Sequence, residues 1–548
     1  MKRYRTGGLF LILILAGALA GGWFGDGVRA GGEADDAAQL DQLLKTFSEA
    51  LATVESNYAQ EVDSDELLGN AIHGMLNTLD PHSSYFAAPD YSKLREEQQG
   101  QYYGLGISIR PERPGTGRIR IVQPPSEGTP AARVGLRHGD IISRVNAEPI
   151  DDWTVDEVIS KLKGPKGTTV DITVERPGAD KPIDLTVERD AIPIYTIRYA
   201  FHVRPGIGYV RIDRFSETTS DELDQALAKL DAENLDGLIL DLRNNPGGSL
   251  RQSIEVSDRF LEREELIVST RGRGGELEQR YRAPRGRSYD YPMVVLINRH
   301  SASASEIVSG ALQDHDRALI LGETSFGKAL VQTVFTLDDN RGLALTTGKY
   351  YTPSDRLIQR PYQGGNYDWE NTEDEELADE VHLTDAGRKV FGGGGIKPDV
   401  VEKSELLPKL AARASYRNLY YFFSGKLIRG EVDTDKNFSY AYETVSHWPE
   451  EKQEELAGKL TIDPKGRAME LFRDFLKEKD IEFTEDEFEE SRDVMANRLE
   501  REVFLAVFGE SRAMRVTLEI DNQVQRAIEL MPKASALFDK AQQAKNDD

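Results

Sequence analysis

The pattern of hydrophobic and polar positions changes several times along this chain, and each change marks a predicted element. Between residues 40 and 58, and again from 64 to 76, apolar side chains recur every three or four residues, which predicts two amphipathic helices. Their apolar faces need a cover, either the body of the protein or a second copy. From residue 100 to about 190 the chain becomes a series of short β-type runs with two helical stretches, which is typical of a small, partly open β-barrel.

Beyond residue 191 strands and helices alternate, which favours an α/β domain. The predicted strands are 207–211, 237–242, 293–297, 318–321 and 329–334, and the predicted helices are 220–230, 252–260 and the segment after Ser303. Parallel βαβ units bring their loops to one edge of a sheet, so we expect the loops after the second and third of these strands to converge. Helical patterns resume after residue 406 and predict an added helical domain.

The two converging loops carry groups suited to catalysis. Gly247 and Gly248 end the first loop, where bare backbone N–H groups can approach a ligand. Ser301, Ser303 and Ser305 lie where the strand at 293–297 gives way to a helix. Unpaired N–H groups and the helix dipole would stabilise an oxyanion there. Taken alone, the serines also fit simple N-caps and the glycines an ordinary βα turn, so the local pattern leaves both interpretations open.

Lys328 is the candidate base, since it precedes an apolar strand and is expected to be enclosed. A lysine acts as a general base only when burial lowers its pKa from about 10.4 toward 7. A serine–histidine–aspartate triad built on His300, or on His315 with Asp314 and Asp316, is the alternative. It is disfavoured because the Asp-His-Asp segment follows the helix, one helix length from the serine. The histidines also lack metal-ligand spacing, so no metal and no other cofactor is expected.

Composition and the N-terminus narrow the functional class. A formal net charge of -26 over 548 residues argues against nucleic-acid binding, and the absence of cysteine excludes thiol chemistry and disulfides. Basic residues precede an uncharged apolar run at 7–24, which predicts export to the periplasm or cell envelope. The run fits a cleaved signal peptide or an inner-membrane anchor, and both remain open. A dense acidic insert at 370–380 is expected to be a surface loop.

Six ordered blocks make the chain resemble the carboxy-terminal processing proteases, also called tail-specific proteases. The blocks are LDPHSSYF, YYGLGI, LRNNPGG, SASASEIVSGALQD, GETSFGKALVQT and GGGGIKPDV, and the resemblance covers about residues 40–401. It implies a multidomain α/β fold in which a crotonase-like (ClpP/crotonase type) protease core carries an inserted PDZ β-barrel. The chain is expected to begin with a signal peptide or membrane anchor and a spacer (1–32), followed by an N-terminal helical segment (33–99). The PDZ domain (100–190), the protease core (191–405) and a C-terminal helical extension (406–548) are expected to follow.

The resemblance also implies roles for particular residues. Ser303 is the expected nucleophile, Lys328 the general base and Gln332 the residue that orients the lysine. The family spacing selects Ser303 over its two neighbours, because nothing in the serines themselves does. The expected oxyanion hole combines the amide of Ala304 with that of Gly247 or Gly248.

The PDZ-like segment is expected to bind the C-terminal tails of protein or peptide substrates by strand addition and carboxylate capture. The peptide-binding residues are expected to be Tyr103, Gly104, Leu105, Gly106, Ile107, Val158 and Leu162. The turn that begins at Lys163 is a candidate for coupling peptide binding to Gln332. The predicted function is an exported serine endopeptidase, and the alternative is a catalytically silent peptide-binding scaffold. Assembly of copies through the N- or C-terminal helices is also considered.

Overall fold

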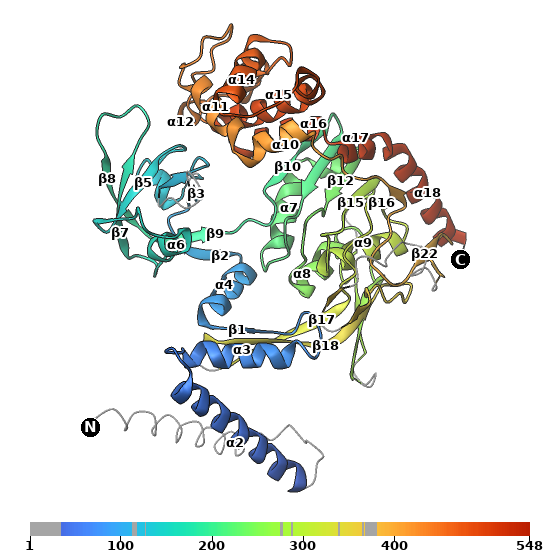
Figure 1. Ribbon diagram of the computed structural model, residues 1–548. Helices are drawn as coiled ribbons and strands as arrows, with labels where there is room; N and C mark the ends of the chain where they lie inside the picture. The colour runs from blue at the N-terminus through green and yellow to red at the C-terminus, as the bar shows by residue number, and fades with distance from the viewer. Residues whose placement is uncertain are drawn as a thin grey trace, which may run out of the picture. The chain divides into compact units, whose positions relative to one another are not determined.

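A computed structural model describes residues 34–547, except 112–117, 127, 274–277, 287–288, 338–339, 364–365 and 368–380. The chain divides into two units, Met1–Met75 and Leu76–Asp548 (Figure 1). The predicted export segment at 7–24 and the acidic insert at 370–380 lie outside the described residues. Within the described part, no helix is both long enough and apolar enough to cross a membrane.

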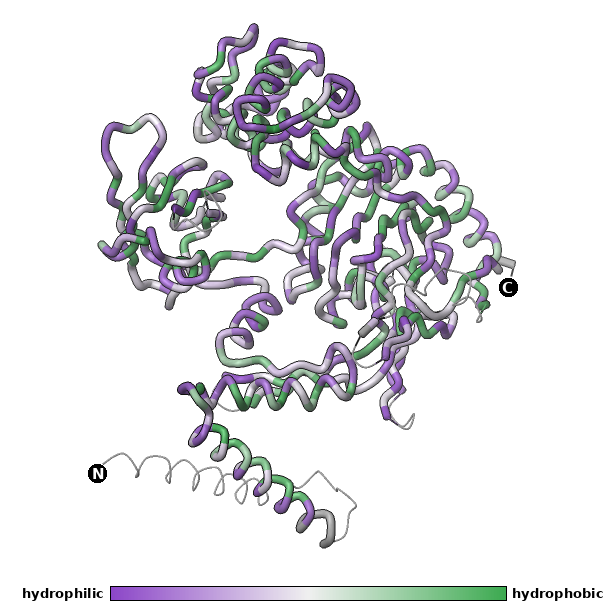
Figure 2. The backbone as a smooth tube through the Cα atoms, viewed as in Figure 1, coloured by the Kyte–Doolittle hydropathy of each residue, from purple (hydrophilic) through white to green (hydrophobic). Residues whose placement is uncertain are grey.

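The first unit contains the two helices that the periodicity predicts, apart from the last residue of the second helix. They are α2 (Ala34–Asn57) and α3 (Ser64–Leu76). Hydrophobic and hydrophilic residues alternate along α2 (Figure 2). Its apolar stripe is largely exposed in the single chain, with exposed fractions from 41 to 61 % for Leu40, Leu43, Leu44, Phe47 and Val54.

The β-type runs between residues 100 and 190 form a small domain with its own core. The sheet order is β3-β4-β5-β7-β8, with β6 paired to β5. The strands are β3 (Ile109–Pro111), β4 (Ile119–Ile121), β5 (Ile141–Val145), β6 (Glu148–Pro149), β7 (Thr169–Glu175) and β8 (Ile183–Glu188), and the helices are α5 (Pro130–Arg133) and α6 (Val155–Leu162). A capping box between Thr154 and Glu157 begins α6. β3 is an edge strand, because it pairs only with β4 among the described strands.

A six-stranded sheet lies at the centre of the larger domain, in the order β10-β11-β12-β15-β16-β23. β10 pairs antiparallel with β11, and the other neighbours pair in parallel. The strands are β10 (Tyr199–Arg204), β11 (Ile207–Arg211), β12 (Gly237–Asp241), β15 (Met293–Ile297), β16 (Leu319–Gly322) and β23 (Val400–Val401). β12, β15 and β16 are buried along their whole length, as expected for parallel strands covered on both faces.

Helices cover both faces of this sheet (Figure 1). One layer consists of α7 (Thr219–Lys229), α8 (Leu250–Asp258) and α9 (Ala304–Asp314), and the other contains α17 (Asn522–Glu529) and α18 (Met531–Asp547). Leu238 and Leu240 pack in the first layer, whereas Ile239 packs in the second, since successive strand residues point to opposite faces. The end of the C-terminal extension therefore completes the core of the sheet.

A second sheet contains the strand that follows Lys328. Its strands are β1 (Ser84–Phe86), β13 (Leu266–Gly272), β14 (Gln279–Arg282), β17 (Leu330–Thr336) and β18 (Gly342–Tyr351). The strand predicted at 329–334 was expected to continue the alternation of strands and helices, and this was wrong: β17 follows β16 without a helix between them and pairs antiparallel with β18 in the second sheet. Apolar content alone does not distinguish a parallel strand from one arm of a hairpin.

Short elements connect these parts. α4 (Ala88–Gln99) leads into β2 (Gln101–Gly104), which pairs antiparallel with β9 (Asp190–Pro193). The remaining elements are the 3₁₀ helix Ala232–Asn234 and the strands β19 (Tyr362–Gln363), β20 (Asn366–Tyr367), β21 (Val381–Leu383) and β22 (Lys389–Phe391).

The C-terminal extension is helical, as the periodicity predicts. Its first helices are α10 (Lys409–Tyr416), α11 (Leu419–Ile428), α12 (Tyr442–Val445), α13 (Glu450–Leu460), α14 (Arg467–Glu478) and α15 (Glu485–Phe508), followed by α16 (Glu510–Glu519). The helices from α10 to α16 share a core rich in phenylalanine, separate from the core of the sheet. The extension thus combines a bundle of its own with the two helices that cover the sheet.

Candidate active site

Of the three serines in the small-residue turn, only Ser303 lines the cleft beside the turn. The Ser301 hydroxyl donates to the carbonyl of Leu242 at 2.8 Å, and the Ser305 hydroxyl donates to the carbonyl of Asn245 at 3.0 Å. Both of these serines are fully buried. The neighbouring serines therefore join the turn to the loop at 242–249 between β12 and α8, called the glycine loop below. Ser303 alone is placed to meet a ligand.

Ser303 has a backbone conformation that L-residues rarely adopt, with φ at +55° immediately before α9. The Glu306 carboxylate accepts a hydrogen bond from the Ser303 amide at 2.7 Å, and the Tyr350 hydroxyl donates to the Ser303 carbonyl at 3.2 Å. Such strained conformations persist only where surrounding contacts fix them, and they cluster at functional sites.

The glycine loop packs directly against this turn. A Cβ on Gly247 would lie 2.8 Å from Cβ of Ser303, and a Cβ on Gly248 would lie 2.0 Å from the carbonyl oxygen of Phe215. Gly248 also has φ at +140°, which disfavours other residues. The Ala302 amide donates to the Asn245 carbonyl at 3.0 Å. The expectation that the two loops converge is therefore confirmed.

The sequence leaves Gly247 and Gly248 as alternative donors of the oxyanion hole, and the hydrogen bonds of their backbone amides distinguish them. The Gly247 amide already donates to Oδ1 of Asn245 at 2.9 Å. Within the described residues, the amides of Gly248 and Ala304 make no hydrogen bond to protein, and both residues line the cleft. Gly248 and Ala304 are therefore the pair of free donors beside Ser303.

Lys328 lines the same cleft from the end of the loop before β17. Its Nζ donates to Oε1 of Gln332 at 3.0 Å, and Nε2 of Gln332 donates to the carbonyl of His82 at 2.7 Å. Burial lowers the pKa of Lys328, and the negative charges of Glu306 and Asp80 oppose that effect. Among the described hydrogen bonds none joins Nζ to the Ser303 hydroxyl, which is common before substrate binds.

Glu306 is a central residue of the site that the sequence analysis missed. Its carboxylate accepts the amides of Ser303, Gly327 and Lys328 together with the hydroxyl of Ser325. Burial raises its pKa to about 7, and the four donors act in the opposite direction. The Ser-x-x-Glu spacing of a capping box was the available signal for this residue.

His82 is the second residue that the sequence analysis missed, although its segment was one of the six blocks. Asp80 holds the turn by accepting the amides of His82 and Ser83, each at 2.8 Å. The His82 ring lies 2.6 Å from the hydroxyl of Tyr367. Burial and the positive charge of Lys328 lower the pKa of His82 to about 4, so the ring is neutral at neutral pH. The carbonyl of His82, not its ring, receives Gln332.

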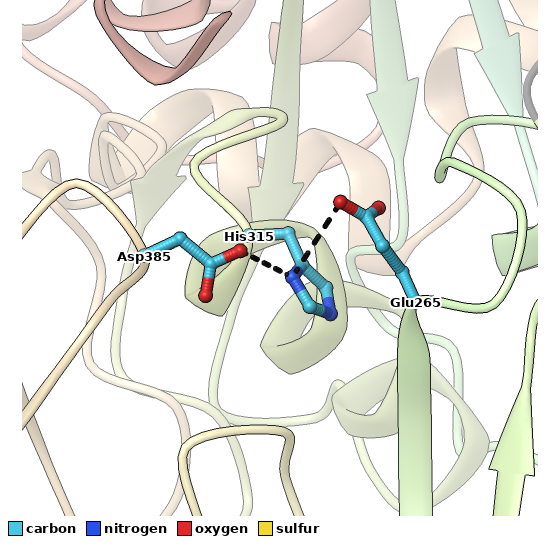
Figure 3. Close-up of side chains that lie close together, drawn as sticks. All are labelled: Glu265, His315 and Asp385. Carbon is cyan, nitrogen blue, oxygen red and sulfur yellow. Dashed lines mark hydrogen bonds and ion pairs between the residues drawn. The ribbon is translucent and has the colours of Figure 1, made fainter. Parts of the chain in front are cut away.

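His315 lies at the other end of α9 from Ser303, about 16 Å away along a helix of 11 residues. Figure 3 shows its ring between Glu265 and Asp385. Nδ1 lies 2.7 Å from Asp385, and Nε2 lies 2.7 Å from the carbonyl oxygen of Leu266. Burial alone lowers the pKa of His315, but Asp385 and Glu265 raise it above its usual value. This position excludes a triad built on His315.

The same three side chains approach one another closely enough to hold a cation, since their ligand atoms lie within 4.8 Å. The group is better explained by hydrogen bonds and charge pairs. Both nitrogens of His315 face acceptors, so the ring has no lone pair left for a metal, and Lys545 forms an ion pair with Glu265. We therefore interpret the group as a buried charge network that anchors α18.

The cleft has a volume of about 560 Å³. Its apolar lining comes from Phe86, Leu94, Leu250, Ile307, Leu330 and Val334, and Glu97, Arg214 and Glu217 bring charge to it. Several separate parts of the chain thus form its walls: β1 and α4, the loop between β11 and α7, the glycine loop, the Ser303 turn with α9, and the strands β17 and β18. An extended peptide segment with an apolar side chain fits such a lining.

The predicted peptide-binding residues all lie in or beside the small β-domain. Tyr103 and Gly104 belong to β2, and Gly106 has φ at +78° in the loop that follows. Leu105, Val158 and Leu162 are buried in the domain's core. Their contact with a peptide remains a prediction. Lys163, the candidate link to Gln332, instead forms an ion pair of 2.6 Å with Glu96 of α4.

The comparisons with known proteins agree with this architecture. The model of Peptidase family S41 matches residues 206–368, the PDZ domain model matches 121–176, and the model of the Activating protease CtpB N-terminal domain matches 26–89. A carboxy-terminal-processing protease of Bartonella bacilliformis is 44 % identical over 321 residues, which cover 58 % of this chain and 72 % of the relative. Carboxy-terminal processing protease CtpA of Bacillus subtilis is 34 % identical, over 59 % of this chain and 67 % of the relative.

Solved structures give weaker whole-chain similarity. A photosystem II D1 C-terminal processing protease is 26 % identical and covers 65 % of this chain and 92 % of its own, with a TM-score of 0.33. The PDZ domain of a carboxy-terminal protease from Vibrio cholerae, solved with a peptide, is 30 % identical and covers 17 % of this chain and 97 % of its own, with a TM-score of 0.15.

Proposed function

Because this chain belongs to peptidase family S41, the carboxy-terminal processing proteases, and is a serine peptidase with a PDZ domain, we propose that it cleaves protein tails with a Ser303–Lys328 dyad. The single observation that carries the proposal is the cleft where Ser303, Lys328 and the free amides of Gly248 and Ala304 meet. The alternative of a silent scaffold has no observation in its favour.

The proposed reaction begins with the neutral amine of Lys328. It takes the proton from the Ser303 hydroxyl as the serine oxygen attacks the carbonyl carbon of the substrate's peptide bond. Gln332, held by the His82 carbonyl, keeps the lone pair of Nζ directed into the cleft. Burial supports this role, because it favours the neutral form of the lysine.

The oxygen of the tetrahedral intermediate would accept hydrogen bonds from the amides of Gly248 and Ala304. Collapse of the intermediate breaks the C–N bond, and the ammonium of Lys328 returns its proton to the leaving amine. Water then attacks the acyl-enzyme with Lys328 again as the base, which releases the new carboxylate and restores Ser303. No step needs a metal or a cofactor.

The PDZ domain is proposed to capture the substrate's terminal carboxylate at the loop around Gly106 and to deliver the tail to the cleft. The domain boundaries given above belong to this proposal. Export through residues 7–24, a place in the periplasm or cell envelope, inner-membrane association and assembly of copies through terminal helices also stay predictions.

A test of tail recognition uses two fluorogenic peptides that differ only at the C-terminus, one a free acid and one an amide. We expect kcat/KM to be about tenfold higher for the free acid, mainly through KM, because carboxylate capture adds binding shared by ground state and transition state. In Gly106→Ala the preference should disappear, since φ is +78° and the new Cβ would lie 2.7 Å from Cβ of Thr129.

Gly178→Ala is the matched control, because it has φ at +86° in the same domain but open space around the new Cβ. It should keep the preference for the free acid. Equal kcat/KM for acid and amide in the unaltered protein would rule out carboxylate capture and leave the dyad untouched.

A further inference from the structure

Arg243 lies between the central sheet and the C-terminal extension. It follows β12 by two residues, and only 8 % of its surface is exposed. Its Nε and Nη2 donate to the carboxylate of Asp241 at 2.7 to 3.1 Å. Its Nη1 points the other way, to Asp521 at 3.0 Å and to Gln523 at 2.7 Å. The guanidinium therefore joins the sheet to α17.

Asp241 forms the side of this contact that belongs to the central sheet. Asp241 is fully buried, and it also accepts a hydrogen bond of 2.7 Å from the hydroxyl of Tyr209 on β11. Burial alone raises the pKa of Asp241, but the guanidinium of Arg243 holds that pKa below its usual value. A buried carboxylate of this kind needs its cation, because an unpaired buried charge is strongly destabilising.

The extension side is equally well defined. Asp521 is the N-cap of α17 and accepts the Val524 amide at 3.0 Å while it faces Arg243. Gln523 is 1 % exposed, and its Nε2 donates to the carbonyl of Glu402 at 2.5 Å. Asp521 and Gln523 are thus each held by a hydrogen bond other than the one to Arg243. Such held acceptors can fix the position of the guanidinium.

The backbone of Arg243 leads directly into the glycine loop. Asn244 follows with φ at +60°, and its amide donates to Asn298 at 3.0 Å. Gly248 lies only five residues after Arg243. A shift of Arg243 would therefore move the Gly248 amide relative to Ala304, and stabilisation of an oxyanion falls steeply with such displacement.

We propose that the C-terminal extension is part of the catalytic unit, because Asp521 and Gln523 of α17 position Arg243 and, through it, the Gly248 amide. The extension lies beyond the segment of the chain that resembles the family, so this is a role for residues outside the family pattern. The inference rests on the proposed function, in which Gly248 and Ala304 stabilise the oxyanion. Asp521 and Gln523 are positioning residues and touch no reacting atom.

The test is the double variant Asp521→Asn/Gln523→Met. Asparagine remains a good N-cap, so α17 should stay capped, while the charge and the second acceptor for Arg243 are lost. We expect kcat on a fluorogenic peptide to fall about tenfold with KM changed less than twofold. The inhibition constant of a peptide aldehyde, whose hemiacetal oxygen needs the oxyanion hole, should rise by a similar factor.

Gln525→Met on the same helix is the matched control. Gln525 also accepts from an arginine of the central sheet, the exposed Arg204 of β10, at 2.8 Å, and donates to a backbone carbonyl, Leu518 at 2.8 Å. It makes no hydrogen bond to the described residues of the glycine loop. This variant should keep kcat, KM and aldehyde binding within twofold of the unaltered protein. Melting temperatures of both variants show whether a loss of kcat merely follows a loss of stability.

The possible results separate the two proposals. A double variant with unchanged kcat and aldehyde binding would overturn the inference, provided that Ser303→Ala is inactive. An equal fall of kcat in the double variant and in Gln525→Met would also overturn it, because the effect would then be general loosening of the extension. Full activity of Ser303→Ala would instead reject the proposed function on which the inference rests.

Discussion

Replacing Ser303 with alanine is expected to lower kcat for peptide cleavage on the order of 10⁴-fold or more, to the background of the assay. The change removes the only hydroxyl of the SASAS turn that lines the cleft. The fold should be retained, because Glu306 and Tyr350 hold the strained backbone of residue 303 through its amide and its carbonyl, which alanine keeps. The measurement is kcat on a fluorogenic peptide, with circular dichroism and melting temperature as the check on folding.

Ser301→Ala and Ser305→Ala are the matched controls for this result. Ser305→Ala removes one buried hydrogen bond to the glycine loop and should cost about 1 kcal/mol of stability. Ser301→Ala removes the bond to Leu242 and the acceptor of the Asn298 amide, so it should cost about 2 kcal/mol. In both variants kcat should fall far less than in Ser303→Ala. If Ser301→Ala or Ser305→Ala lost activity as completely as Ser303→Ala while remaining folded, the choice of Ser303 as the nucleophile would be wrong.

Replacing Lys328 with methionine is expected to lower kcat by about 10³-fold to 10⁴-fold, the upper range for loss of a general base. Methionine has a similar length and keeps the apolar contacts but accepts no proton. Stability should not fall at neutral pH. The folded-state pKa of Lys328 is lowered by burial, so the unfolded chain binds more protons between that pKa and the unfolded value, and the buried ammonium opposes folding at lower pH.

The pH dependence of kcat/KM is a second test of Lys328 as the general base. Because the neutral amine is the active form, kcat/KM should rise with pH through the lowered pKa of Lys328 and then level off. His82 is already neutral above about pH 4, so it should contribute no step near neutrality. Glu306, whose pKa burial raises to about 7, also titrates in this range, so the step that belongs to Lys328 is the one that Lys328→Met removes. Lys349→Met, an exposed lysine on β18, is the control and should leave the profile unchanged. A folded Lys328→Met variant with normal kcat would exclude the lysine as the base.

The sequence was sufficient to predict the order of the strand, turn and helix around Ser303. A buried strand, a small-residue turn and an amphipathic helix follow one another between residues 293 and 314, and the structure has β15, the Ser303 turn and α9 there. The choice of Ser303 came from resemblance, whereas the structure gives a physical reason for it. Ser301 and Ser305 direct their hydroxyls into the protein, and periodicity carries no information on that direction.

Tertiary contacts account for what the sequence did not predict. The pairing of β17 with β18 depends on a hairpin partner, and the pattern of one strand does not name its partner. The capping-box spacing indicates the contact of Glu306 with Ser303, but no spacing reveals that Glu306 also accepts the Lys328 amide or that the His82 carbonyl accepts from Gln332. The contact of Arg243 with Gln523 joins residues 280 positions apart.

The central claim is a covalent acyl-enzyme on Ser303, and the most direct measurement traps it. The protein is mixed with an activated ester of a tail-like peptide and quenched in acid, and the modified residue is then identified by peptide mass spectrometry. The account predicts one acyl group per chain, attached to Ser303 and absent from Ser303→Ala. An acyl group on Ser301, Ser305 or another residue, or full turnover by Ser303→Ala, would contradict it.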